Sequence, residues 1–154
     1  MKKLSAMFVT AAALAALVAS TGAADAKGRD RGREYAKVDV GRVIARVEDQ
    51  SGAFRKAVDR QLDHSRLNGT RREDRINAEV KQYDRTVDAL RSEFSRRDSW
   101  METRGNVERV LRQAADVNRI MHDENLGRGV ENEWGNLRRE LNSLADVYNL
   151  KPLR

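Results

Sequence analysis

The stretch that decides the fold is residues 76–94, INAEVKQYDRTVDALRSEF. Its apolar residues recur at alternating steps of four and three, at Ile76, Val80, Tyr83, Val87, Leu90 and Phe94. A helix turns once every 3.6 residues, so this spacing places these side chains along one narrow stripe. Charged and polar residues fill most other positions, which favours an amphipathic helix that buries its stripe against other helices.

The same spacing continues on both sides of this stretch. Three further stripes are apolar apart from one serine: Val40, Ile44, Val47, Ser51, Phe54, Val58 and Leu62; Trp100, Val107, Val110, Leu111, Ala114, Val117, Ile120 and Met121; and Val130, Trp134, Leu137, Leu141, Leu144 and Tyr148. No segment shows the period-two alternation of a half-buried strand. The sequence therefore predicts an all-α protein.

Short polar segments separate the stripes. Asn68 and Gly69 can end a helix, because glycine adopts the left-handed conformation without steric cost. Thr70 and Glu73 follow in the spacing of a capping box, which starts the next helix. We therefore expect a boundary between two helices near residue 69.

The remaining boundaries follow in the same way. The segment 99–102, SWME, repeats the capping-box spacing, and 126–129, LGRG, separates the last two stripes. Whether the second and third helices are separated by a tight turn or by a bend stays open. The pattern predicts helices at about 40–67, 71–96, 100–124 and 130–149.

Four helices joined by short connections favour an antiparallel up-down four-helix bundle, here over residues 38–150. The expected core takes its members from all four stripes: Phe54, Val58, Leu62, Val80, Tyr83, Val87, Leu90, Phe94, Leu111, Val117, Trp134, Leu137, Leu141 and Leu144.

The first 26 residues have the organisation of a signal peptide. The basic start Met1-Lys2-Lys3 precedes an uncharged, Ala-rich segment at 4–19, and Ala24-Asp25-Ala26 fits the small-x-small pattern of a cleavage site. The uncharged segment is shorter than the ~20 residues that span a bilayer. We expect cleavage after Ala26, a periplasmic or secreted protein, and no transmembrane span once the signal is removed.

The net charge of +6 is concentrated near the N-terminus. The segment 27–37, KGRDRGREYAK, has five basic and two acidic residues and no apolar stripe, so we expect a flexible basic segment. Weak contacts to an acidic partner or an anionic surface are expected from its cations: Lys27, Arg29, Arg31, Arg33 and Lys37. Elsewhere acids interrupt the arginine clusters, so no one-sign face predicts nucleic-acid binding.

The residues with metal-binding chemistry are few. The chain has no cysteine and two histidines, His64 and His122. In an up-down bundle both would lie at the same end, with Asp123 beside the second, and these three are the weak candidates for a metal site. No HxxxH or ExxH spacing places two ligands on one helix face, so the interpretation of solvated histidines near helix C-termini is favoured.

No catalytic motif is present. The sequence lacks GxSxG, a phosphate-binding glycine loop and SxxK, and its paired carboxylates lie among arginines as in a solvated helix face. We therefore expect no enzyme activity and no cofactor.

Two segments resemble a family of small, uncharacterised exported helical bacterial proteins. They are 65–74, SRLNGTRRED, and 134–148, which reads WxxLRxxLNxLAxxY. The resemblance implies a shared fold and location and carries no known function. The chain also resembles small periplasmic helical chaperones in size and composition, but it lacks their LTxxQ motif.

These features lead to one expected function and two alternatives. We expect an exported, non-enzymatic helical-bundle protein of the cell envelope that acts by protein or surface interaction. The first alternative is a small-ligand or metal binder at the bundle end that carries His64 and His122. The second is a periplasmic chaperone-like stress protein. Monomer and homo-oligomer both stay open.

Overall fold

The structure is a computed structural model that describes residues 35–154. Within this range the chain forms four α-helices: α1 (Lys37–Asp63), α2 (Arg71–Arg96), α3 (Arg104–Asp123) and α4 (Arg128–Val147). A short 3-10 helix, η1 (Trp100–Thr103), precedes α3. Residues 35–154 contain no strand, so the all-α prediction is confirmed. The predicted signal peptide, 1–26, lies outside the described residues.

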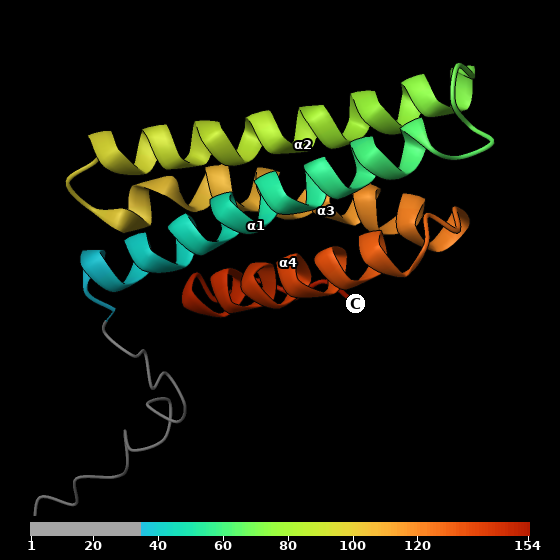
Figure 1. Ribbon diagram of the computed structural model, residues 1–154. Coiled ribbons are helices and arrows are strands. Elements are labelled where there is room, and N and C mark those ends of the chain that lie inside the picture. The colour runs from blue at the N-terminus through green and yellow to red at the C-terminus, as the bar shows by residue number, and fades with distance from the viewer. Residues whose placement is uncertain (1–34) are drawn as a thin grey trace, which may run out of the picture. The chain divides into compact units, whose positions relative to one another are not determined.

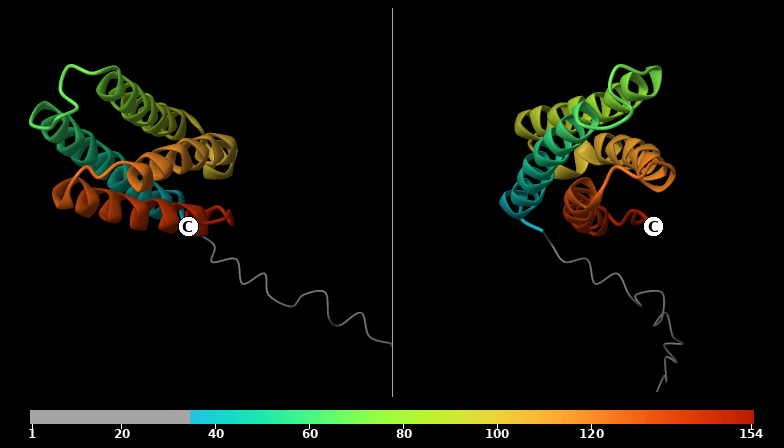
Figure 2. Two further views of the ribbon diagram at one scale, coloured as in Figure 1. Left: turned by 90° about the vertical axis from the view of Figure 1, so that its right-hand side faces the viewer. Right: turned by 45° about the vertical axis from the view of Figure 1, so that its right-hand side comes forward.

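The helices pack side by side, and consecutive helices run in opposite directions (Figure 1). α1 lies between α2 and α4 and packs extensively on both, and α3 packs mainly on α2. The contact between α3 and α4 is the least extensive of those between neighbouring helices. Two further views show the same neighbours (Figure 2).

Every residue of the expected core is buried, whereas Trp100, Ile120 and Met121 of the third stripe are only partly buried. Burial of one large aliphatic or aromatic side chain contributes about 1.5–3 kcal/mol, so the stripes account for most of the favourable packing. Phe54 on α1 and Trp134 on α4 pack with their ring centroids 5.3 Å apart. Ser51 is the polar member of the α1 stripe, and it is 1% exposed.

The first connection ends α1 earlier than expected. α1 stops at Asp63 rather than near residue 67, because 64–70 turns back on the helix end. The Asn68 side-chain amide donates to the carbonyl of Asp63 at 2.6 Å, and Thr70 Oγ1 accepts the backbone N–H of Glu73 at 3.3 Å. Polar side chains here compete with the helix for its own terminal groups.

The second connection contains a turn. α2 ends at Arg96, and residues 97–99 lead into η1. A hydrogen bond from Ser99 N–H to Glu102 Oε1, at 3.1 Å, stabilises the start of η1. At the same end Trp100 and Tyr148 pack edge to face, with centroids 5.0 Å apart. A turn, and not a bend, therefore separates the second and third helices. The α-helix α3 begins at Arg104 instead of at residue 100.

The start of α1 also differs from expectation. Lys37 is the first residue of α1 and does not belong to a flexible segment. Its ammonium donates to the carbonyl of Arg97 and lies 5.6 Å from the centre of the Phe94 ring, so it joins α1 to the end of α2. In the described part of the chain, no helix is both long enough and apolar enough to cross a membrane.

Candidate functional site

A surface groove with a volume of about 620 Å³ lies between α2 and α3. It lies where α2 begins and α3 ends. Its lining residues carry charges of both signs around an apolar floor: Arg72, Arg75, Ile76 and Glu79 from α2, Asp116, Arg119, Ile120 and Asp123 from α3, and Glu124, the residue that follows α3. We call it the α2–α3 groove.

Ion pairs hold the walls of the α2–α3 groove. Arg72 Nε lies 2.7 Å from Glu124 Oε1, and this pair joins the start of α2 to the end of α3. Arg119 pairs with Asp116 one turn away on α3. The exposed Arg119–Asp116 pair contributes about 0–1 kcal/mol to stability, and the Glu124 side chain of the other pair is partly covered. These ion pairs therefore position the side chains that line the groove more than they stabilise the fold.

Two side chains of the groove are free to meet a ligand. Arg75 and Glu79 are exposed, and neither makes a salt bridge to another described residue. They lie one helical turn apart, beside Ile76, which is 3% exposed. A cation, an anion and an apolar floor within one turn suit a protein segment that carries both charge signs.

Sequence reasoning did not single out this groove. Arg71, Arg72 and Arg75 form one of the arginine clusters that acids interrupt, and that pattern indicated no site. The pairing of Arg72 with Glu124 depends on how α2 lies on α3, and nothing local in the sequence specifies it.

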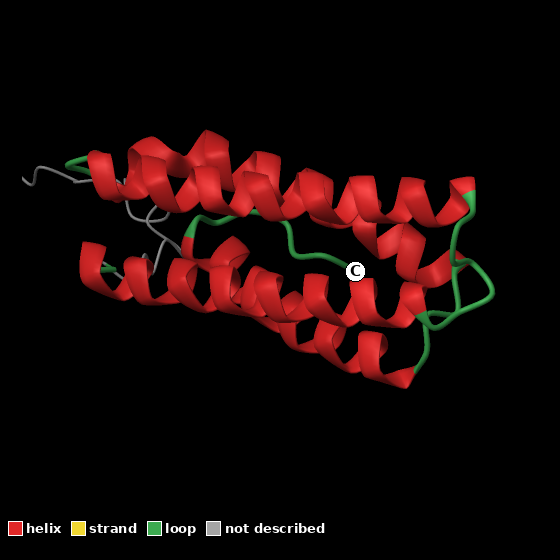
Figure 3. Ribbon diagram, turned by 45° about the horizontal axis from the view of Figure 1, so that its top comes forward, coloured by secondary structure: helices red, strands yellow, loops and turns green. Residues whose placement is uncertain are grey.

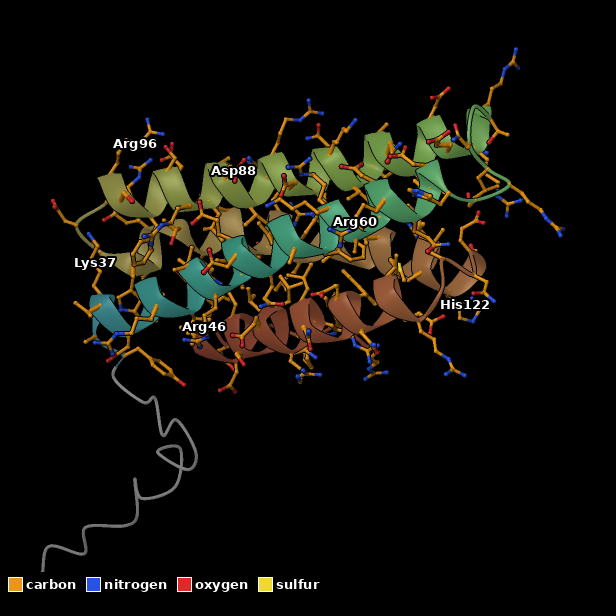
Figure 4. The ribbon with its side chains drawn as sticks, in the orientation of Figure 1. Lys37, Arg46, Arg60, Asp88, Arg96 and His122 are labelled. Atoms are coloured by element: carbon orange, nitrogen blue, oxygen red, sulfur yellow. The ribbon has the colours of Figure 1, made fainter. Side chains whose placement is uncertain are left out.

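The two histidines named as weak candidates for a metal site lie at the ends of different helices. His64 is the C-cap of α1, where its Nδ1 lies 2.7 Å from the carbonyl oxygen of Arg60. His122 lies on α3, exposed, with Nδ1 3.1 Å from Asp123 Oδ1 (Figure 4). Among the described residues no three His, Asp or Glu side chains are grouped so as to hold a metal ion.

The basic segment predicted to contact an anionic partner is described in part. Lys27, Arg29, Arg31 and Arg33 lie outside the described residues. Lys37 lies in the first turn of α1, and its ammonium is directed to the end of α2 (Figure 4).

A polar cluster at the α1–α2 interface was also missed. Ser51 Oγ donates to Asp84 Oδ1 at 2.8 Å, and Arg55 Nε lies 2.9 Å from Asp84 Oδ2. The signal in the sequence was the serine that interrupts the first stripe. The cluster lies within the helix interface and belongs to the packing of α1 on α2.

Tyr83 of α2 is buried, and its hydroxyl has no hydrogen-bond partner among residues 35–154. Burial, with a further contribution from the charge of Asp84, raises the pKa of Tyr83 well above its ordinary value of 10. The phenol therefore stays neutral and is unsuited to act as a proton donor near neutral pH.

Comparison with known protein families, with curated proteins and with solved structures found no match for this chain.

Proposed function

We propose that this protein is an exported antiparallel four-helix bundle of the cell envelope that works by binding another envelope protein rather than by catalysis. The N-terminal 26 residues supply the export signal in this proposal. The mature chain starts at Lys27, and its basic first residues give a weak additional attraction to acidic proteins or anionic surfaces.

The α2–α3 groove is the observation that carries this proposal. It combines a volume of about 620 Å³ with an apolar floor and with walls of both charge signs. Small-molecule sites are mostly apolar and enclosed, whereas mixed charge around a small apolar centre is typical of protein interfaces. Arg75 and Glu79 make no salt bridge within residues 35–154, so they can form ion pairs with a partner without first breaking one there.

Export is tested by the identity of the mature N-terminus. The full-length gene is expressed with a C-terminal tag, cells are fractionated, and the intact mass of the tagged protein is measured. The proposal expects a periplasmic or secreted product that begins at Lys27. An Ala26→Arg variant should accumulate uncleaved, because signal peptidase requires a small residue before the cleavage site. A cytoplasmic protein of full length overturns the exported location.

Binding at the α2–α3 groove is tested by photo-crosslinking in cells. A benzophenone amino acid is placed at Arg75 or Glu79 and, as a matched control, at Asp88, an exposed position of the same helix outside the groove (Figure 4). The proposal expects one discrete crosslinked protein from the groove positions that is absent from the Asp88 control. Equal crosslinking at all three positions, or none, rejects the groove as the interface.

A further inference from the structure

The residues after α4 form an ordered strap. Asn149–Arg154, here called the C-terminal strap, follow the end of α4 and return along the helices as a loop (Figure 3). The reversal is a Schellman-type ending: Asn149 N–H donates to the carbonyl of Asp146 at 3.1 Å, and Leu150 N–H to that of Ala145 at 2.8 Å. Asn149 supplies the left-handed conformation that this turn needs, with φ of 50°.

The strap is held by its backbone. The side chain of Asn142 on α4 donates from Nδ2 to the carbonyl of Leu153 at 3.3 Å and accepts the N–H of Leu153 at 2.7 Å. One amide side chain thus satisfies both polar groups of one residue of an extended segment. This recognition depends on the extended backbone and is independent of which side chain residue 153 carries.

A second asparagine extends the same arrangement onto α3. Asn118 Nδ2 donates to the carbonyl of Arg154 at 3.1 Å. The orientation of Asn118 is set by Trp134, whose indole N–H donates to Asn118 Oδ1 at 3.0 Å. Asn142 and Asn118 therefore present amides from α4 and α3 to consecutive residues of the strap.

Apolar contacts also hold the strap on α3 and α4. Leu150 and Leu153, three residues apart, pack against the core, whereas Lys151 and Pro152 between them are exposed. Beside the strap, Leu111 and Ala115 of α3 line one side of an open hollow of about 390 Å³, and strap residues line the other. The strap lies along the pair of neighbouring helices with the least direct contact, α3 and α4.

The surface of α3 and α4 on which the strap lies, with Asn118 and Asn142 at its edges, is here called the channel. We infer that the channel is a binding site for an extended peptide segment of a partner protein, and that the strap occupies this site in cis. The strap shows which chemistry the channel accepts: two apolar side chains three residues apart, an extended backbone with a free N–H at the second of them, and a basic residue after it. The partner segment displaces the strap, which is joined to α4 by a single turn at Asn149.

The site is separate from the α2–α3 groove, since the two share none of the residues that carry either argument. The strap competes with a partner segment at high effective concentration, because it is tethered to α4 only a few residues from the site it occupies. A partner segment therefore binds the intact protein weakly and binds an opened channel more tightly.

The test measures binding of a fluorescein-labelled peptide of the strap sequence, NLKPLR, to the purified protein by anisotropy. In the Leu150→Ser/Leu153→Ser variant the strap loses its apolar contacts while the channel is unchanged, so the peptide should bind at least about tenfold more tightly than to the wild type. Adding Asn142→Ala should abolish that gain. Arg75→Glu, in the other groove, should leave it unchanged and so separates this site from the proposed interface.

Two peptide controls sharpen the result. A peptide methylated on the backbone nitrogen of its second leucine lacks the N–H that Asn142 accepts, and it should bind at least about tenfold more weakly. A peptide with both leucines replaced by serine should not bind. Failure of NLKPLR to bind a strap variant with wild-type helical content overturns the inference. So does dimerisation of that variant in light scattering with no peptide binding, which would assign the channel to a second copy.

A measurement on the wild type covers the case in which the strap variant does not fold. Hydrogen exchange at the Leu153 amide, whose N–H is bonded to Asn142, should become faster when NLKPLR is added in large excess. Unchanged protection of Leu153 at saturating peptide overturns the displacement of the strap.

Discussion

Ser51 of α1 donates a 2.8 Å hydrogen bond to Asp84 of α2, and this bond lies on a stripe that is otherwise apolar. Ser51 is 1% exposed, and the second oxygen of Asp84 lies 2.9 Å from Arg55 Nε. A shift of one helix along the other by a single turn would leave the serine hydroxyl and the carboxylate without these partners. The cluster therefore specifies the register of α1 on α2.

Replacing Ser51 should reveal this coupling. Ser51→Ala should lower the free energy of unfolding by about 1 kcal/mol, because Asp84 loses a hydrogen-bond donor in a half-buried setting. The loss of unfolding free energy caused by Ser51→Ala should be smaller in an Asp84→Ala background. Urea unfolding of the wild type, the two single variants and the double variant measures this difference. The control is Ser143→Ala on the exposed face of α4, which should change stability by less than about 0.5 kcal/mol. Additive effects of Ser51→Ala and Asp84→Ala would contradict the register argument.

The two buried tyrosines should respond oppositely to loss of their hydroxyls. Tyr83→Phe should leave stability unchanged or raise it by up to about 1 kcal/mol, because it removes a buried hydroxyl without a partner. Tyr148→Phe should lower it by about 1 kcal/mol, because that hydroxyl bonds Thr103 Oγ1 at 2.8 Å and the carbonyl of Trp100 at 3.2 Å. Thermal melts of both variants test this, and a loss at Tyr83 equal to that at Tyr148 would refute it.

Stability should fall in alkali. Burial raises the pKa of Tyr83 and of Tyr148 above 10, so above that pH the unfolded chain releases tyrosine protons that the folded chain keeps. The contribution of these tyrosines is complete below about pH 10 and is lost as the pH rises beyond it. Urea midpoints between pH 8 and 11.5 should decline less steeply for Tyr83→Phe than for the wild type. Parallel curves for the two proteins would argue against this origin.

Two glycines of α1 provide a matched pair. A Cβ at Gly52 would have no heavy atom within 4 Å, so Gly52→Ala should raise the free energy of unfolding by about 0.5–1 kcal/mol through helix propensity. A Cβ at Gly41 would lie 3.1 Å from Cε1 of Phe94, so the ring must move and Gly41→Ala should gain less than Gly52→Ala. Chemical denaturation measures both, and equal gains would show that α1 does not approach α2 as closely as described.

The turn that starts the C-terminal strap should tolerate only residues that accept a positive φ. Asn149→Gly should stay within about 0.5 kcal/mol of the wild type, whereas Asn149→Val should lose about 1–2 kcal/mol because a β-branched residue is strained at φ of 50°. Melting temperatures of the two variants check this. Wild-type stability of Asn149→Val would mean that the chain does not reverse at this residue.

Local pattern was sufficient for the helices and for the core. The steps of four and three specify which side of each helix is apolar, and an apolar side has to be buried, so every predicted core residue is buried. The N-cap at Thr70 was also readable, since its hydroxyl accepts the N–H of Glu73 three residues on. The other half of the predicted capping box differs, because the Glu73 carboxylate accepts the N–H of Gly69 and not that of Thr70. The helix ends were less accurate. Lys37 bonds to the end of α2, and local hydrogen bonds of Ser65 and Asn68 to the last turn of α1 end that helix before residues 64–67.

The candidate sites depended on tertiary structure. Many arginines and acids are available in the sequence, and only the packing of α2 on α3 pairs Arg72 with Glu124 and leaves Arg75 and Glu79 without a salt bridge to the rest of 35–154. The same holds for the strap, since Asn142 and Asn118 are ordinary polar helix residues until the chain reverses at Asn149 and lies across them.

The sequence by itself therefore determined that this chain is helical and which residues form its interior, because both follow from the spacing of neighbouring residues along one helix. Only the tertiary structure decided which helices adjoin and which polar groups meet, in the α2–α3 groove, at Ser51 and Asp84, and along the strap. Those pairings depend on the rotation and register of one helix against another, and a single polar contact contributes too little net free energy for its partner to be predicted from the sequence alone.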